Sequence, residues 1–222
     1  MPTLIALLFL PLAIIVAQLA LGATGGLANG MYKLAFIIPP VIYCRVHGIR
    51  IGREIFRWQH WRNDLGLAVL LGVVAAAVFL GLYAVLGPLV IDKQAIAAKI
   101  HQQFGVSAGT VLLIAPFTIL INSLVEEFFY RGFAFGLIAS RRPVLGTLLP
   151  AAVFTVQHLM FAYHWVGPGM IALGVMALFV FSLVAQALYA KADSIVAPWI
   201  VHIFGDLAMM AIALELVSLG SS

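Results

Sequence analysis

Six ionisable side chains lie inside long apolar stretches of this sequence, where charge is rare. Carboxylates and imidazoles are the common general bases and acids of enzymes, and they also bind metal ions. Peptide hydrolysis needs a base for water, a donor to the carbonyl oxygen and an acid for the leaving amine. This set could supply all three: Glu126, Glu127, Arg131, His158, His202 and Asp206.

The spacing of these residues predicts that they lie at one depth. Glu126 precedes the turn at Arg141-Arg142 by about 15 residues, and His158 follows it by about 16. At 1.5 Å per residue, both lie roughly 22–24 Å along an antiparallel pair of helices. His202 and Asp206 lie roughly 14–20 Å along a third helix, counted from the turn near residue 193. We therefore expect three helices to place an acid and two imidazoles around one buried water.

Local spacing separates supporting residues from reactive ones. Glu127 and Arg131 are four residues apart, so they share a helix face and form an expected structural ion pair. Glu126 is rotated by about 100° and is free to face another helix. Phe154 lies one turn before His158, where it would wall the same pocket.

The helices that must position these residues are membrane helices. The sequence is 64% hydrophobic and 9% charged, against about 25% charged residues in a soluble domain. Several apolar stretches reach the roughly 20 residues needed to cross a bilayer. We expect one all-α integral membrane domain over residues 1–222, a bundle of about seven spans: 2–22, 31–46, 65–90, 108–140, 143–163, 168–190 and 194–218. Pro39-Pro40 is expected to break or tilt the second span, and Pro116 to kink the fourth.

The basic residues predict an orientation. Eight of them fall on one side, in the loop 45–62 and the turns near 141 and 191, against three on the other side. The positive-inside rule places the first side, together with the N-terminus, in the cytoplasm. The net charge of +4 is therefore assigned to membrane topology and not to nucleic-acid binding.

Three motifs carry a family resemblance. Residues 126–131 read EExxxR, residues 154–158 read FxxxH and residues 202–206 read HxxxD. In this order, on separate membrane helices, they resemble the CAAX protease and bacteriocin-processing family of glutamic-type intramembrane proteases, including the type II CAAX prenyl endopeptidases. The resemblance covers about residues 110–215, which we take as the catalytic core.

The resemblance implies an all-helical intramembrane peptidase and a role for each motif. Glu126 would activate water with His158 as its partner, while His202 and Asp206 would bind the substrate carbonyl and stabilise the oxyanion. Glu127 and Arg131 match the supporting pair of the family. The last motif often ends in Asn, so Asp206 would have to be protonated, orient His202 or bind a cation.

Alternatives remain open at this point. Glu126, His158 and His202 could be three zinc ligands with water in the fourth place, although no HExxH pair is present; we favour catalysis without a metal or other cofactor. A non-enzymatic immunity or partner-binding protein could also use such a scaffold, and a transporter could carry buried carboxylates. The expected substrate is a membrane-associated protein or peptide, either a sorting tail, signal or bacteriocin-like peptide or a prenylated protein. The expected location is a prokaryotic cell membrane.

Overall fold

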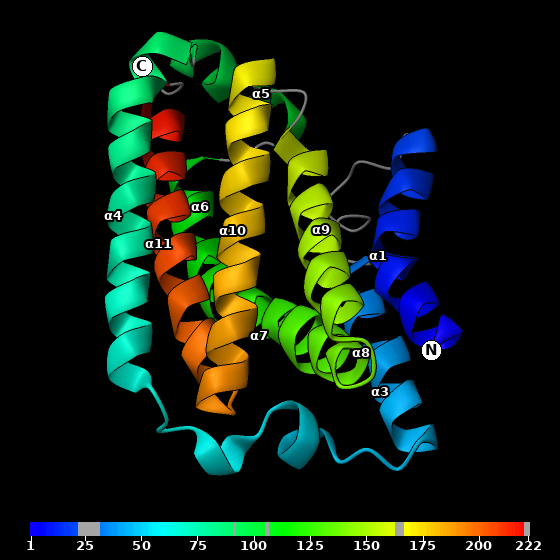
Figure 1. The fold of residues 1–222 in the computed structure, drawn as a ribbon. Helices are drawn as coiled ribbons and strands as arrows, with labels where there is room; N and C mark the ends of the chain where they lie inside the picture. The colour runs from blue at the N-terminus through cyan, green and yellow to red at the C-terminus, as the bar shows by residue number, and fades with distance from the viewer. Residues whose placement is uncertain (22–31, 91, 105–106, 163–166, 220–222) are drawn as a thin grey trace.

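The computed structural model describes residues 1–21, 32–90, 92–104, 107–162 and 167–219, and every regular element in these ranges is helical. Six of the described helices are long and apolar enough to cross a membrane: Pro2–Ala20, Leu65–Leu89, Gly109–Ala139, Pro143–Met160, Pro168–Ala192 and Val196–Ser218. A seventh crossing results if the bent pair Tyr32–Val46 and Ile51–His60 counts as one span. The predicted all-α membrane bundle is confirmed (Figure 1).

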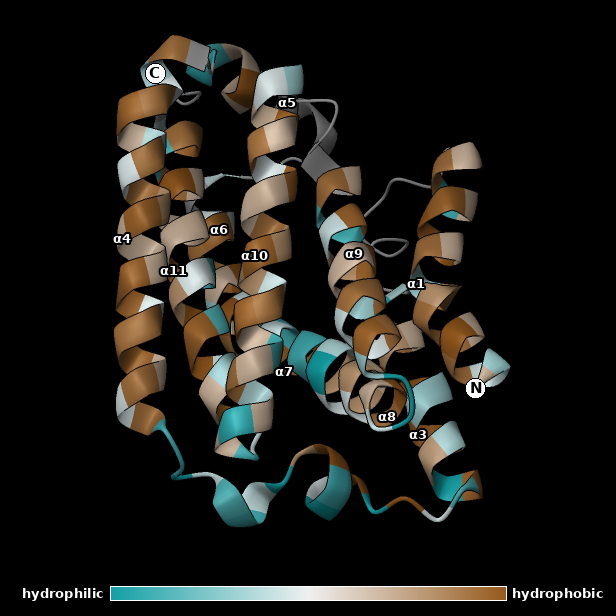
Figure 2. Cartoon of the chain, in the orientation of Figure 1, coloured by the Kyte–Doolittle hydropathy of each residue, from teal (hydrophilic) through white to brown (hydrophobic). Residues whose placement is uncertain are grey.

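The outer surface of the bundle is suited to lipid. Helix α4 (Leu65–Val90) is hydrophobic along its whole length (Figure 2). Large apolar side chains are exposed on it, among them Leu70, Val78 and Val85, and Leu113 is exposed on α6. In water these side chains would be a liability, whereas in a bilayer their exposure costs nothing because lipid tails are equally apolar.

The second predicted span is short and broken. It begins after α1 (Pro2–Ala20) with a 3₁₀ turn, η1 (Tyr32–Phe36), and continues as α3 (Ile38–Val46). Pro39 and Pro40 occupy the first turn of α3, where a missing backbone N–H is tolerated. The prolines therefore start the second piece of the span instead of kinking its middle.

The fourth predicted span is a chain of five helical pieces. These are α6 (Ala108–Pro116), η4 (Phe117–Asn122), α7 (Ser123–Glu127), η5 (Phe128–Phe135) and α8 (Gly136–Ala139). The α-helix gives way to π-helical turns directly after Pro116, and a second π-helical stretch follows Glu127. In Figure 1 the segment passes obliquely through the bundle, from α6 at the back to α8 at the front. Insertions of this kind are common where a helix must aim functional side chains.

Three further helices complete the bundle: α9 (Pro143–Ala162), α10 (Pro168–Ala192) and α11 (Val196–Leu219). The loop carrying η2 (Ile51–Ile55) and η3 (Trp58–His60) lies across one end, and the N-terminus and the α10–α11 turn point to the same end (Figure 1). Helix α5 (Lys93–Phe104) lies at the opposite end. Ion pairs of Arg57 with Asp193 and of Lys191 with Asp64 fasten the loop to the α10–α11 turn.

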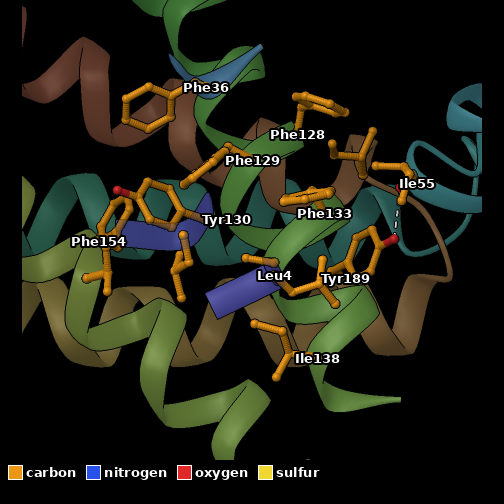
Figure 3. Packing of buried hydrophobic residues seen from close by; sticks show 14 of the residues in the cluster. Leu4, Phe36, Ile55, Phe128, Phe129, Tyr130, Phe133, Ile138, Phe154 and Tyr189 are labelled. Carbon is orange, nitrogen blue, oxygen red and sulfur yellow. Dashed lines mark hydrogen bonds between the residues drawn. The ribbon is translucent and has the colours of Figure 1, made fainter. Parts of the chain in front are cut away.

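An aromatic core surrounds the oblique segment. Phe128, Phe129 and Phe133 of η5 are buried together with Phe36 of η1 and Ile55 of η2 (Figure 3). The Tyr189 hydroxyl donates to the Ile55 carbonyl at 2.8 Å, which anchors the end loop to α10. This packing fixes η5, which continues directly from the glutamate-bearing helix α7.

Candidate active site

The structure brings together the reactive side chains proposed from the sequence. Glu126 projects from α7, His158 from α9 and His202 from α11. The Glu126 Oε2 atom lies 3.3 Å from His158 Nε2 and 3.8 Å from His202 Nε2. One ligand atom from each of these residues lies within 4.8 Å of the others. The three side chains therefore lie at one depth in the bundle, as the residue counts predict.

The two carboxylate oxygens of Glu126 have different surroundings. Oε1 forms an ion pair with the Lys33 ammonium and accepts a hydrogen bond of 3.1 Å from the Asn122 amide. Oε2 is buried and has no hydrogen-bond partner among the described residues. One oxygen is thus anchored, and the other points towards the two imidazoles.

Each imidazole is held through the nitrogen that faces away from Glu126. His158 Nδ1 lies 2.9 Å from the Phe154 carbonyl, which can only accept, so Nδ1 carries the proton. His202 Nδ1 lies 2.7 Å from Glu127 Oε1 and donates to that carboxylate. Both Nε2 atoms therefore face Glu126, and the orientation of each ring is fixed by the hydrogen-bond partner of its Nδ1 atom.

A fully buried ion pair supports His202. The same Glu127 Oε1 lies 2.9 Å from Arg131 Nη1. The Arg131 guanidinium lies 4.5 Å from the Phe154 ring centroid and 5.5 Å from that of Phe181. Spacing predicts the Glu127–Arg131 pair, and the structure adds that this pair orients a histidine.

Phe154 lies between the supporting pair and the imidazoles. Its ring centroid is 4.1 Å from that of His158 and 6.1 Å from that of His202. Its backbone carbonyl accepts a hydrogen bond from His158 Nδ1. The residue thus forms a wall of the site, as its position one turn before His158 predicts.

Asp206 lies on the reactive side of His202. Its Oδ1 is 3.7 Å from Nε2, the nitrogen that also faces Glu126. The orienting nitrogen, Nδ1, is bound by Glu127. Glu127 therefore orients His202 by binding Nδ1. Asp206 contacts the other ring nitrogen and does not have this role.

Side chains that could serve as rival nucleophiles are occupied or distant. The Ser123 hydroxyl donates to the Ile119 carbonyl and accepts a bond of 3.0 Å from the Trp199 indole. Cys44 lies on α3, and its side chain is fully buried. Neither side chain forms a hydrogen bond with a histidine or a carboxylate among the described residues.

Lys33 is a further residue of the site that motif spacing does not reveal. Charge counting places this lysine on the non-cytoplasmic side, at the start of the second span, and gives it no role, whereas η1 places it against Glu126. The available signal is a lone lysine followed by the apolar run from Leu34 to Val41. Such a lysine costs free energy in a membrane unless a carboxylate receives it.

The arrangement has the chemistry of a hydrolytic site. A water between Glu126 Oε2 and the two Nε2 atoms would meet a carboxylate base and two imidazoles at once. The same three atoms also form a donor set of the kind that binds zinc. Lys33 counts against a metal, because its ammonium already neutralises the carboxylate that would have to bind the cation.

Comparison with known protein families identifies a related family. A family model described as type II CAAX prenyl endopeptidase Rce1-like matches residues 108–208. No curated protein and no solved structure matches the chain significantly. The matched segment contains all three motifs, and the resemblance inferred from them is confirmed.

Proposed function

We propose that this chain, which belongs through residues 108–208 to the Rce1-like family of type II CAAX prenyl endopeptidases, hydrolyses peptide bonds by means of a glutamate-activated water. The observation that carries the proposal is the convergence of two imidazole nitrogens on Glu126 Oε2, with His158 Nε2 at 3.3 Å and His202 Nε2 at 3.8 Å. A single water beside Oε2 could contact a carboxylate base and an imidazole at the same time, which is the arrangement that general acid–base catalysis requires.

The geometry supports a direct hydrolysis. Oε2 removes a proton from the bound water while the water oxygen adds to the substrate carbonyl carbon. As an imidazolium, His202 donates from Nδ1 to Glu127 and from Nε2 to the developing oxyanion. The Asp206 carboxylate, whose Oδ1 lies 3.7 Å from Nε2, stabilises the positive charge of the imidazolium. The proton held by Glu126 then passes to the leaving nitrogen, directly or through His158, and the C–N bond breaks to give a carboxylic acid and an amine.

Catalysis without a metal is part of the proposal. The alternative is a zinc site formed by Glu126, His158 and His202. The Nδ1 atoms of the two histidines are hydrogen-bonded to oxygen atoms, as they are in many zinc sites. The Lys33 ammonium favours the metal-free reaction, because a second cation on Glu126 would be repelled.

The proposed substrate is a membrane-associated protein or peptide of a prokaryotic cell membrane. The site lies within a bundle whose outer surface is suited to lipid, which favours a substrate held in the same membrane. A C-terminal sorting tail, a signal or a bacteriocin-like peptide fits this setting, and a prenylated protein is the alternative.

The test compares membranes from cells that carry wild type, Glu126→Gln or Glu215→Gln. Glu215 is a matched control because it pairs with Lys93 at 2.5 Å, away from the site. Mass spectrometry should find one or more proteins uncleaved with Glu126→Gln only. Identical cleavage products in all three membranes would contradict the proposal. A cellular function of the protein that persists in Glu126→Gln would indicate a non-enzymatic binding protein.

A further inference from the structure

A lysine from outside the matched family segment reaches the proposed base. Lys33 lies in η1, 93 residues before Glu126 in the chain. Its side chain is 26% exposed and that of Glu126 is 2% exposed. The ammonium also lies 5.1 Å from the ring centroid of Tyr32 and 5.2 Å from that of Phe36, where aromatic faces favour a cation.

The contact is specific to one carboxylate oxygen. Lys33 and Asn122 both bind Oε1. Oε2 is left facing His158 and His202. A carboxylate held by two donors on one oxygen cannot rotate without losing both, so the pair fixes which oxygen meets the water.

The charges around Glu126 leave this role to Lys33. Glu127 and Arg131, which lie in the same helical segment as Glu126, pair with each other. On α11, Asp206 adds a further carboxylate beside His202. The histidines, His158 and His202, balance a carboxylate only when protonated. Among the described residues around Glu126, Lys33 therefore supplies the permanent positive charge on this side chain.

We infer that Lys33 is a positioning residue that keeps the Glu126 carboxylate charged and directs its Oε2 towards the catalytic water. This inference rests on the proposed function for its catalytic meaning. Its physical content, a lysine that sets the protonation and orientation of Glu126, can be measured without any substrate. It also means that η1 contributes to a site whose other members lie within residues 108–208.

The primary test is infrared spectroscopy of the purified protein in lipid nanodiscs across a pH titration. The carbonyl stretch of a protonated carboxylic acid is assigned to Glu126 by its absence in Glu126→Gln. In Lys33→Met this band should appear at a pH about one unit or more above that of wild type. The reason is that an opposite charge in contact with a carboxyl group lowers its pKa by about one to three units. Lys33→Arg should behave as wild type. Lys93→Met, which removes a lysine from the outer ion pair with Glu215, should do the same.

The activity of Lys33→Met should shift in parallel, whereas Lys33→Arg and Lys93→Met should keep the wild-type pH profile. For a peptide found in the membrane comparison, Lys33→Met should move the acidic limb of kcat/KM to higher pH and lower kcat more than it raises KM. Unchanged titration of the Glu126 band in Lys33→Met would overturn the inference whether or not the protein is a protease. Loss of cleavage in Glu126→Gln is a separate result that tests only the proposed function.

A folding defect would still be informative. If Lys33→Met is unstable because it leaves a buried carboxylate unpaired, the double variant Lys33→Met/Glu126→Gln should recover the wild-type melting temperature. Failure of both variants to fold would show that Lys33 serves packing alone and would overturn the inference.

Discussion

Glu127 connects two charged partners through a single oxygen. Its Oε1 lies 2.9 Å from Arg131 Nη1 and 2.7 Å from His202 Nδ1. All three side chains are buried. The residue therefore couples the stability of the bundle to the orientation of one imidazole, and substitution should affect both.

We predict that Glu127→Gln lowers kcat by about 100-fold or more, since loss of the carboxylate that orients a histidine has effects of this size or larger elsewhere. It should also destabilise the fold by about 3–5 kcal/mol, because Arg131 is left as an unpaired buried cation. Steady-state kinetics and thermal unfolding in detergent measure the two effects. In Glu127→Gln/Arg131→Met the stability should recover while kcat stays low; recovery of both would mean that Glu127 has no orienting role.

At the residue scale the sequence predicts the chemistry well where spacing along a helix decides it. The Glu127–Arg131 pair follows from a four-residue interval, and the depth of Glu126 and His158 follows from counting out from one turn. The Lys33 contact could not be predicted in this way, because it joins residues 93 positions apart through a broken span. The partners of the two His202 ring nitrogens, Glu127 at Nδ1 and Glu126 at Nε2, also depend on the orientation of the ring, which residue spacing does not determine.

At the scale of elements, the hairpin between α8 and α9 sets the register of Glu126 against His158. Gly146 lies in the first turn of α9, against α8. A Cβ added at Gly146 would overlap the backbone N and Cα atoms of Ala139. The two helices can approach this closely only because position 146 carries no side chain.

We predict that Gly146→Ala destabilises the protein by at least about 1–3 kcal/mol, the cost of overpacking against atoms that cannot move aside. Thermal unfolding in detergent measures this change. Gly81→Ala on α4 is the matched control, because nothing lies within 4 Å of its added Cβ. Equal melting temperatures for the two variants would contradict the packing described for the hairpin.

Element boundaries show where sequence reasoning reaches its limit. Apolar runs predict the long spans to within a few residues, because length and hydrophobicity alone decide a crossing. The two π-helical stretches around α7 carry no such signal. They depend on how η5 packs against its neighbours, and Gly132 illustrates this, since an added Cβ there would overlap Ile55 of the end loop.

At the scale of the whole molecule, most of the basic residues lie at one end. The arginine-bearing loop 45–62, the turn at 141–142 and Lys191 share the end at which the N-terminus lies, and Figure 2 shows this end as a hydrophilic band. Trp58 and Trp61 are exposed in this loop, as is typical of residues at a membrane interface. The pattern predicts that this end faces the cytoplasm.

Single cysteines at matched glutamines test the orientation. In a Cys44→Ser background, Gln94→Cys near the opposite end should react with a membrane-impermeant thiol reagent in intact cells. Gln59→Cys in the basic loop should react only after permeabilisation. Both glutamines are exposed in the structure, and the reverse labelling pattern would contradict the assigned topology.

The central claim is that a carboxylate, acting without a metal, activates the water. The most direct measurement is kcat of purified wild type, Glu126→Gln and Glu215→Gln after exhaustive chelation, with and without added zinc. We predict that chelated wild type and Glu215→Gln keep full activity, whereas Glu126→Gln loses about 10²- to 10⁴-fold, the contribution of a general base. Activity that disappears on chelation and returns with zinc, or a Glu126→Gln variant as active as wild type, would contradict the claim.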